Sequence, residues 1–539
     1  MEMNPFRLDV FKNLFASVAD EMGVTLGRAA YSVNIKERKD FSCALFDERG
    51  RMISQAAHIP VHLGSMPMAV KAAMEIPAGP NDVIIHNDPF FGGTHLPDVT
   101  LVKPVFIGGR RRFFTACRAH FSDIGGMTPG SMPVSRDIFQ EGLILPPMKL
   151  TQEVRWILLA NVRNWREVSG DLAALTASCE TGAKRLRDLV SRYGLTTVNR
   201  YAEGLQVYAR RWMQKAIATI PPGRFRFEDE LDDDGVGGPP TKIRVWIARI
   251  GDGVRVDFTG SDRQVPGNLN AVYAVTCSAV LYCFRCLVDE EIPLNEGAAQ
   301  PISVIAPWGT VVNARRPAAV TAGNVETSQR IVDVVFGALA KALPRRIPAA
   351  SQGTMNNVSF GGDGFAYYET LAGGMGASPR RDGASGVHSH MTNTLNTPIE
   401  AFEHAYPVRI GEYGLRRGSG GKGKHRGGDG LVRSYEFLVP AQVSVISERR
   451  RKGPYGLKGG KAGKPGRNLL NKRPLPSKAN FDVKSGDVLR IETPGGGAWG
   501  GKRERVSERV RECVFSPVLD ENSRVGGRWS RSAVSGSRR

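Results

Sequence analysis

The clearest pattern in the sequence is an alternation of apolar and polar positions between residues 99 and 119. Residues 99–106 are apolar, β-branched and alternating, which is typical of a strand, and residues 112–119 have the same character. Gly108 and Gly109 stand between the two stretches and suit a tight turn. The pattern therefore predicts a hairpin whose open end brings the residues before the first strand close to those after the second.

Longer stretches have a helical period instead. Apolar residues recur there at every third or fourth position, which predicts helices with one face in the core. We expect these helices at residues 5–31, 151–218, 268–288 and 324–343, the first with Phe6, Val10, Leu14, Val18 and Met22 toward the core and the last capped by Asn324.

Short strand patterns separated by glycine-rich turns fill most of the remaining sequence. Together the elements predict an α+β protein with several domains, mixed β-sheets, packed helices, glycine-rich loops and a C-terminal β-rich domain. We expect an N-terminal α+β region at 1–220, a central α/β region at 221–405, a β-rich domain at 406–501 and a disordered basic tail at 502–539.

Composition narrows the class of protein. The sequence has no run of 18 apolar residues, so we expect no membrane-spanning helix. The N-terminus lacks the features of a signal peptide. The seven cysteines are scattered, which favours a reducing cytoplasm. The net charge of +20 favours anionic partners such as phosphates or nucleotides. Nucleic acid is not expected as a partner, because the basic residues are not interleaved with aromatic ones and form no known binding module.

Two pairs of histidine and aspartate flank the predicted hairpin. His95 and Asp98 precede its first strand, and His120 and Asp123 follow its second. Imidazole and carboxylate are ligands of catalytic divalent metals, and two histidines with one aspartate leave coordination positions open. The alternative is that these groups cap turns and satisfy loop backbone. Mixed nitrogen and oxygen ligands suit Mn, Fe and Zn alike.

Other polar residues are candidates for the same site or for a phosphate-binding site. Asp88 follows a short strand at 82–86, and His62 lies in an apolar loop where a structural role is the alternative. Basic, glycine-rich loops between 417 and 465 suit phosphate binding by backbone N–H groups, or else are flexible surface loops. These loops do not contain a P-loop motif.

Several segments resemble one known family. HNDPFFGGTHLPDVTLVKPVF, RAHFSDIGGMTPGSMP, GNVETSQRIVDVVFGAL, DGASGVHSHMTNTLNTPIE and ERRRKGPYGLKGGKAG occur in the order found in the hydantoinase B/oxoprolinase family, and the resemblance covers roughly residues 4–500. The family includes the B subunit of ATP-dependent N-methylhydantoinases, the C-terminal part of 5-oxoprolinases and the α subunit of acetone carboxylase. In the carboxylases a metal is held by a His-x-x-Asp pair and a later histidine, which correspond to His95, Asp98 and His120.

The resemblance implies an ATP-dependent cyclic amidase that acts on a hydantoin, 5-oxoproline or a lactam. It also implies a partner: a hydantoinase A-type subunit that binds most of the ATP and Mg, in a hetero-oligomer expected to be α2β2. The partner would phosphorylate the ring carbonyl, and a divalent metal in this chain would activate water. The alternative is an ATP-dependent ketone carboxylase with the same metal site. In this hypothesis the catalytic residues are Asp123, Asp88 and His62, and the phosphate is neutralised by Arg449, Arg450 and Lys452.

Overall fold

The computed structural model describes residues 3–56 and 58–501 of the chain, so the predicted tail at 502–539 lies outside the described residues. Helices and four β-sheets alternate along the described part, which confirms the α+β class. No helix in this part is both long and apolar enough to span a membrane.

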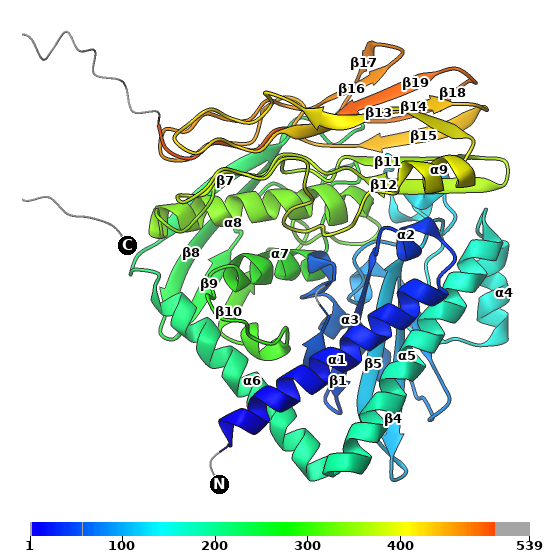
Figure 1. The fold of residues 1–539 in the computed structure, drawn as a ribbon, viewed down its shortest axis with the longest axis vertical. Helices are drawn as coiled ribbons and strands as arrows, with labels where there is room; N and C mark the ends of the chain where they lie inside the picture. The colour runs from blue at the N-terminus through cyan, green and yellow to red at the C-terminus, as the bar shows by residue number, and fades with distance from the viewer. Residues whose placement is uncertain (1–2, 57, 502–539) are drawn as a thin grey trace, which may run out of the picture. The chain divides into compact units, whose positions relative to one another are not determined.

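The first sheet carries the candidate site. Its strands are antiparallel and lie in the order β2-β1-β5-β4-β3-β6. Helices α1 (Pro5–Ala29) and α5 (Trp165–Tyr193) lie side by side and pack against this sheet (Figure 1). The strands are β1 (Phe41–Asp47), β2 (Met52–Gln55), β3 (Ile84–His86), β4 (Asp98–Ile107), β5 (Arg110–His120) and β6 (Met148–Lys149).

Strands β4 and β5 form the predicted hairpin. Gly108 and Gly109 have φ values of 60° and 72°, the left-handed conformation that a two-residue hairpin turn requires and that glycine adopts without strain. The register pairs Asp98 directly with His120 at the open end. The prediction that the hairpin brings these two residues together is therefore confirmed.

Helix α1 was predicted correctly, but part of its expected core face was wrong. Val18 and Met22 are buried as predicted, whereas Phe6 is 82% exposed and Val10 is 49% exposed. The buried stripe instead starts at Phe11, whose ring stacks on that of Tyr201.

The second sheet is mixed. Its strands lie in the order β10-β9-β8-β7, with β9 and β10 parallel and the other pairs antiparallel. Helix α8 (Ser328–Ala342) packs on β7 and β8, and α7 (Tyr273–Arg285) packs on α8. The strands are β7 (Phe225–Leu231), β8 (Thr241–Ile250), β9 (Gly253–Asp257) and β10 (Ile302–Ile305).

Two further antiparallel sheets lie together in the upper part of Figure 1. One has the order β12-β11-β15-β18, from β11 (Asn357–Gly362), β12 (Phe365–Thr370), β15 (Ala441–Ile446) and β18 (Lys478–Val483). The other has the order β13-β14-β19-β16-β17, from β13 (Val408–Arg416), β14 (Gly430–Phe437), β16 (Arg467–Leu470), β17 (Arg473–Leu475) and β19 (Val488–Glu492).

The long helix α6, four shorter helices and several turns complete the described part. They are α2 (Val33–Lys36), α3 (Met66–Met74), α4 (Gln152–Ala160), α6 (Leu195–Ala218), α9 (Ile399–Ala405), the 3-10 turns η1 (Pro60–His62), η2 (Pro89–Phe91), η3 (Pro129–Ser131), η4 (Ile138–Gln140) and η5 (Glu296–Ala298), and a π-helical turn η6 (Gly323–Thr327) that leads into α8.

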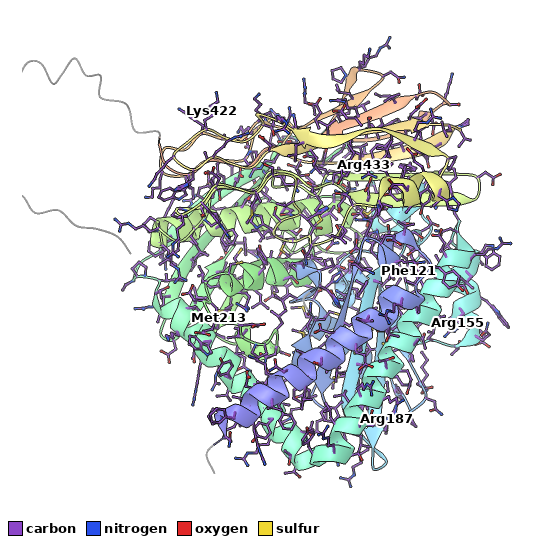
Figure 2. The ribbon with its side chains drawn as sticks, viewed as in Figure 1. Phe121, Arg155, Arg187, Met213, Lys422 and Arg433 are labelled. Carbon is purple, nitrogen blue, oxygen red and sulfur yellow. The ribbon has the colours of Figure 1, made fainter. Side chains whose placement is uncertain are left out.

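Two hydrophobic cores underlie this arrangement. The larger one joins the first two sheets and their helices, and the smaller one lies between the last two sheets, with Phe360, Phe402 and Tyr435 among its residues. Buried side chains such as Phe121 sit among the elements, while Lys422 points outward (Figure 2). Strand β11 pairs with β15 across the expected boundary at 405/406, and the predicted division into domains stays a prediction.

Candidate metal centre

Three predicted ligands meet at the open end of the β4–β5 hairpin. Asp98 is the first residue of β4 and His120 the last of β5. His95 precedes Asp98 by one tight turn, in which the N–H of Asp98 donates to the carbonyl of His95 at 3.1 Å. The turn and the register together bring one ligand atom from each side chain within 4.8 Å of the others.

The three side chains are directed at a common point. Asp98 Oδ1 lies 3.1 Å from His95 Nε2 and 3.2 Å from His120 Nδ1, and the two imidazole centroids are 5.0 Å apart. All three residues are at most 2% exposed. Two nitrogens converging on one carboxylate oxygen is the arrangement expected of ligands that share a cation.

Several ring nitrogens of this cluster lack a hydrogen-bond partner. Within the described part of the chain, both nitrogens of His95 and Nε2 of His120 are buried and make no aligned hydrogen bond, although His95 Nε2 is close to Asp98. A buried nitrogen without a partner costs about 1–3 kcal/mol. A divalent cation between the three side chains would supply a partner for His95 Nε2, the unpaired nitrogen that lies beside Asp98 Oδ1. The set of two imidazoles and one carboxylate fits Mn, Fe or Zn.

The protonation states suit metal binding. Burial alone would raise the pKa of Asp98, but the neighbouring imidazoles of His95, His120 and His62 outweigh it and hold that pKa well below its ordinary value. Burial lowers the pKa of His120 and of His62. These shifts favour the carboxylate form of Asp98 and the neutral imidazole of His120, the forms that bind metals.

His62 joins the cluster from a different element, and its catalytic role stays a prediction. It ends the turn η1, and its Nε2 lies 3.4 Å from Asp98 Oδ2. Its Nδ1 lies 2.9 Å from the hydroxyl of Ser42, which fixes the ring orientation. The hydroxyl of Thr94 donates to the same Asp98 oxygen, so the carboxylate is held on both sides.

A small cavity adjoins the cluster. Its wall contains His62, His95, Asp98 and His120, together with apolar residues such as Met355. Further polar side chains complete the wall: Asp40, Asn324, Tyr368, Thr370, Thr392 and Thr394.

The sequence did not predict that these further polar residues would line the cavity. Asp40 precedes β1, and its carbonyl accepts the N–H of His120 at 3.1 Å, which holds the two residues together. Tyr368 belongs to β12. Asn324 was predicted as a helix cap, but it lies within η6 and makes no cap hydrogen bond among the described residues. Only Asn324 carried a local signal, and that signal indicated a helix start rather than a site.

Two predicted catalytic carboxylates lie elsewhere. Asp123 accepts from the backbone N–H of Arg163 at 2.7 Å and pairs with its guanidinium at 3.0 Å. Asp88 accepts from the N–H of Phe90 and pairs with Arg316. Neither lies in the wall of the cavity, and their catalytic role stays a prediction.

The predicted phosphate-binding residues are engaged with carboxylates of this chain. Arg449 is buried and lies 2.6 Å from Asp229 and 2.5 Å from Asp333. The backbone N–H of Arg450 donates to Asp232, and its guanidinium donates to Asn356, Asn468 and the carbonyl of Glu448. Lys452 is exposed and pairs with Glu230. Of the three, Lys452 is the most exposed.

The glycine-rich loops pack against one another. The N–H of Gly421 donates to Gly496, that of Gly496 to Gly428, and that of Ala498 to Lys461. A Cβ on Gly427 would lie 1.9 Å from the carbonyl oxygen of Gly496, so only glycine allows this approach. These N–H groups are therefore occupied by carbonyls of the chain itself.

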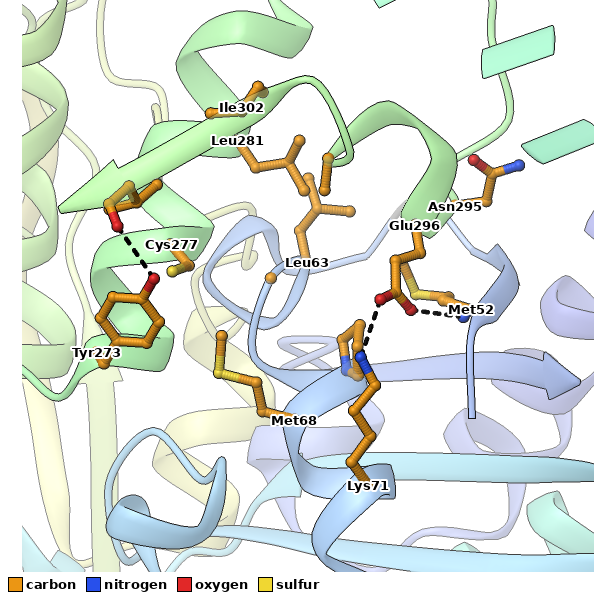
Figure 3. Close-up of a pocket in the computed structure, with 14 residues that line it drawn as sticks. Met52, Leu63, Met68, Lys71, Tyr273, Cys277, Leu281, Asn295, Glu296 and Ile302 are labelled. Atoms are coloured by element: carbon orange, nitrogen blue, oxygen red, sulfur yellow. Dashed lines mark hydrogen bonds and ion pairs between the residues drawn. The ribbon is translucent and has the colours of Figure 1, made fainter. Parts of the chain in front are cut away.

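A second, larger cavity is lined by residues of α3 and α7 (Figure 3). Leu63, which follows His62, and Met68 line it together with residues of α7. Its lining residues Lys71 and Glu296 pair with each other at 2.9 Å, and Tyr273 donates to the carbonyl of Val304. It is largely apolar and, among the described residues, has no cluster of metal ligands.

Comparison with known proteins gives consistent matches over almost the whole chain. The sequence model of hydantoinase B/oxoprolinase matches residues 4–502. The chain is 41% identical to 5-oxoprolinase 1 of Arabidopsis thaliana over 92% of its length, but it spans only 42% of that protein, and about two fifths of several other relatives. It is 33% identical to the B subunit of a putative D-/L-hydantoinase of Pseudomonas sp. (strain NS671), covering 94% of this chain and 92% of that one.

Two solved structures have the same fold. An ATP-dependent caprolactamase from Pseudomonas jessenii aligns with a TM-score of 0.87 and 30% identity, covering 95% of this chain and 94% of that chain. A nucleotide-free acetone carboxylase aligns with a TM-score of 0.82, covering 94% and 77%. At 19% identity, the second likeness shows the fold alone.

Proposed function

Because the chain belongs to the hydantoinase B/oxoprolinase family, we propose that it is one component of an ATP-dependent cyclic amidase that opens the ring of a hydantoin, 5-oxoproline or a lactam. The observation that carries this proposal is the buried cluster of His95, Asp98 and His120 beside a cavity. These three residues would hold a divalent metal, Mn, Fe or Zn.

The metal would supply Lewis acidity, which lowers the pKa of water from about 15.7 toward about 7. The chain itself orients its ligands and takes up protons. His62 lies beside the cluster with a neutral imidazole, so it can accept the proton of the attacking water. Asp40 lines the same cavity and is a second acceptor. Asp123 and Asp88, held by Arg163 and Arg316, would order the loops next to His120 and His95.

The cavity wall also carries a hydrogen-bond acceptor for an amide substrate. Asn324 is 4% exposed, and its Oδ1 has no hydrogen-bond partner among the described residues. An amide N–H of the ring would satisfy this oxygen, since a buried acceptor left unpaired is costly. Apolar residues such as Val61, Val325 and Met391 would contact the ring carbons.

ATP would be handled by a hydantoinase A-type partner, expected in an α2β2 hetero-oligomer. The Pseudomonas hydantoinase relative is one subunit of its enzyme, and the 5-oxoprolinases are more than twice as long as the matched region, which supports a second component. The partner would phosphorylate the ring carbonyl and so weaken amide resonance. Lys452 is the exposed cation of the predicted phosphate-binding set and remains our candidate for contact with the phosphate.

Co-expression with a hydantoinase A-type partner tests the proposal. The complex is incubated with ATP and a panel of hydantoins, 5-oxoproline, lactams and ketones, and metal content is measured in parallel. We expect ATP-dependent ring opening that is lost in His95→Ala and retained in His404→Ala, a matched change at an exposed histidine of α9.

The alternative is carboxylation of a ketone at the same metal site. The likeness to acetone carboxylase supports the shared fold and no more. Incorporation of labelled bicarbonate into a ketone, without ring opening of any amide, would replace the amidase proposal with this one. Full ring-opening activity of His95→Ala would exclude the metal site from the reaction.

A further inference from the structure

Three threonine hydroxyls form a continuous row in the wall of the metal cavity. Thr370 ends β12, and Thr392 and Thr394 come from the loop before α9. Their exposed fractions are 2%, 4% and 4%. The hydroxyl oxygens of Thr370 and Thr394 are 2.9 Å apart, and those of Thr394 and Thr392 are 3.4 Å apart.

A buried guanidinium holds the first hydroxyl of this row. Arg38 is 0% exposed, and its Nη2 donates to the hydroxyl of Thr370 at 3.0 Å. Its Nη1 donates to the carbonyl of Tyr368 at 2.8 Å and to Asn34 at 3.1 Å, so the guanidinium is held in place. Arginine has no acceptor, and Thr370 must therefore accept from it.

The hydroxyls of Thr370 and Thr394 form the next hydrogen bond, in which either oxygen can be the donor. When Thr370 donates to Thr394, the hydroxyl of Thr394 keeps its own proton to give. The 3.4 Å gap to Thr392 is longer than the usual 2.7–2.8 Å of a hydroxyl pair, so this last hydrogen bond is weak. Hydrogen bonds in a row polarise one another, which makes the O–H of Thr392, at the end of the row, a better donor.

We infer that Thr394 and Thr392 form an oxyanion-binding subsite that faces the metal cluster across the cavity they share. This inference rests on the proposed function. The oxyanion would be a phosphoryl oxygen of the activated carbonyl or the carboxylate of the ring-opened product. In both cases hydroxyl donors fixed in advance stabilise negative charge on oxygen without reorganisation.

Substitution of Thr394 by valine and by serine separates the hydroxyl from the shape of the side chain. Thr397→Val is the matched control, because Thr397 is also buried and accepts a hydrogen bond from Tyr367, but does not line the cavity. Binding of inorganic phosphate and of acetate to the metal-loaded complex is measured by calorimetry, and ring opening is measured with the same samples. Thermal unfolding confirms that each variant is folded, and Thr392→Val replaces Thr394→Val where that variant is not.

We expect Thr394→Val to weaken anion binding by about tenfold, the effect of one hydrogen bond to a charged group. It should lower kcat by about 100-fold and change KM less, while Thr394→Ser and Thr397→Val stay within about threefold of wild type. Weaker binding of phosphate alone identifies a phosphoryl subsite, and weaker binding of acetate alone a carboxylate subsite. Unchanged binding of both anions overturns the inference. If wild type opens no ring, the proposed function fails, and the binding measurements still decide the inference.

Discussion

The imidazole of His120 stacks on the phenol ring of Tyr368, with centroids 4.4 Å apart and planes inclined by 19°. The hydroxyl of Tyr368 donates to Asn357 Oδ1 at 2.8 Å, and Asn357 Nδ2 donates to Glu326 Oε1 at 2.7 Å. A candidate metal ligand on the first sheet is thus oriented by a strand of another sheet and by the π-helical turn. The centre depends on packing between distant parts of the sequence.

The stacking predicts a difference between two substitutions of Tyr368. Tyr368→Leu removes the ring that orients His120, and we expect metal affinity to fall by about 10–100-fold, the usual effect of losing an outer partner of a ligand. Tyr368→Phe keeps the ring and should bind metal within a few-fold of wild type. Titration of metal against a competing chelator measures both values. Equal affinity in the two variants would mean that stacking does not orient His120.

Glu326 gives the protein a pH-dependent stability. Burial and the charge of Glu448 raise the pKa of Glu326 to about 8, so the folded state favours its neutral form. The stabilisation is fully present below the ordinary value of 4.5 and is lost as pH rises through about 8. At about 1.4 kcal/mol per pKa unit, the loss is on the order of a few kcal/mol.

Thermal unfolding at pH 5, 6.5 and 8 measures this dependence. We expect the melting temperature of wild type to fall over this range and that of Glu326→Gln to fall less, since glutamine has no proton to lose. Glu400→Gln changes an exposed glutamate of α9 and should follow wild type. A Glu326→Gln profile parallel to that of wild type would assign the pH dependence to other groups.

We predict that Arg449 stabilises the folded protein. Its guanidinium is the close partner of the partly buried Asp229 and the buried Asp333. Arg449→Ala would leave these carboxylates with Arg330 at 3.7 Å as their cation, and breaking a buried pair costs about 3–5 kcal/mol of unfolding free energy. Lys452→Ala removes an exposed ion pair and should cost less than about 1 kcal/mol.

Denaturant unfolding of the two variants checks this prediction. Comparison of Arg449→Ala with Lys452→Ala also separates a structural role of Arg449 from a role in phosphate binding, because Arg449 and Lys452 are close in sequence and differ in burial. A stable Arg449→Ala protein that loses only ATP-dependent activity would instead support a role of Arg449 in binding phosphate.

The sequence predicts local structure here far better than contacts between distant segments. The His95, Asp98 and His120 cluster was predictable because one hairpin and one tight turn create it, and both leave a local pattern in the sequence. Tyr368 and Thr394 reach the same cavity through tertiary packing, which periodicity does not encode. For the same reason Arg449 resembled a phosphate ligand: the sequence shows its charge but not Asp229, which neutralises it.

The start of the predicted helix at 324–343 is another feature that the sequence did not predict correctly. The sequence predicts a regular helix capped by Asn324, whereas the structure has a π-helical turn at this point. Gly323 makes the turn possible, because a Cβ there would lie 2.0 Å from the carbonyl oxygen of Asn270. That close approach is a tertiary feature, and π-helical turns are often found at functional sites.

The final prediction concerns stabilisation by metal. A cation that binds the folded chain and not the unfolded one stabilises it by about 2.7 kcal/mol at 100 times the dissociation constant. We expect Mn, Fe(II) or Zn to raise the melting temperature of wild type and of His404→Ala, but not that of His95→Ala. Mg and Ca prefer all-oxygen ligands and should have little effect, since two of the three ligands are imidazoles. Differential scanning fluorimetry of chelator-treated protein with each metal in turn measures these shifts. An equal shift in His95→Ala would place the responsible cation at another site, because that variant lacks one of the two imidazoles on which the proposed centre depends.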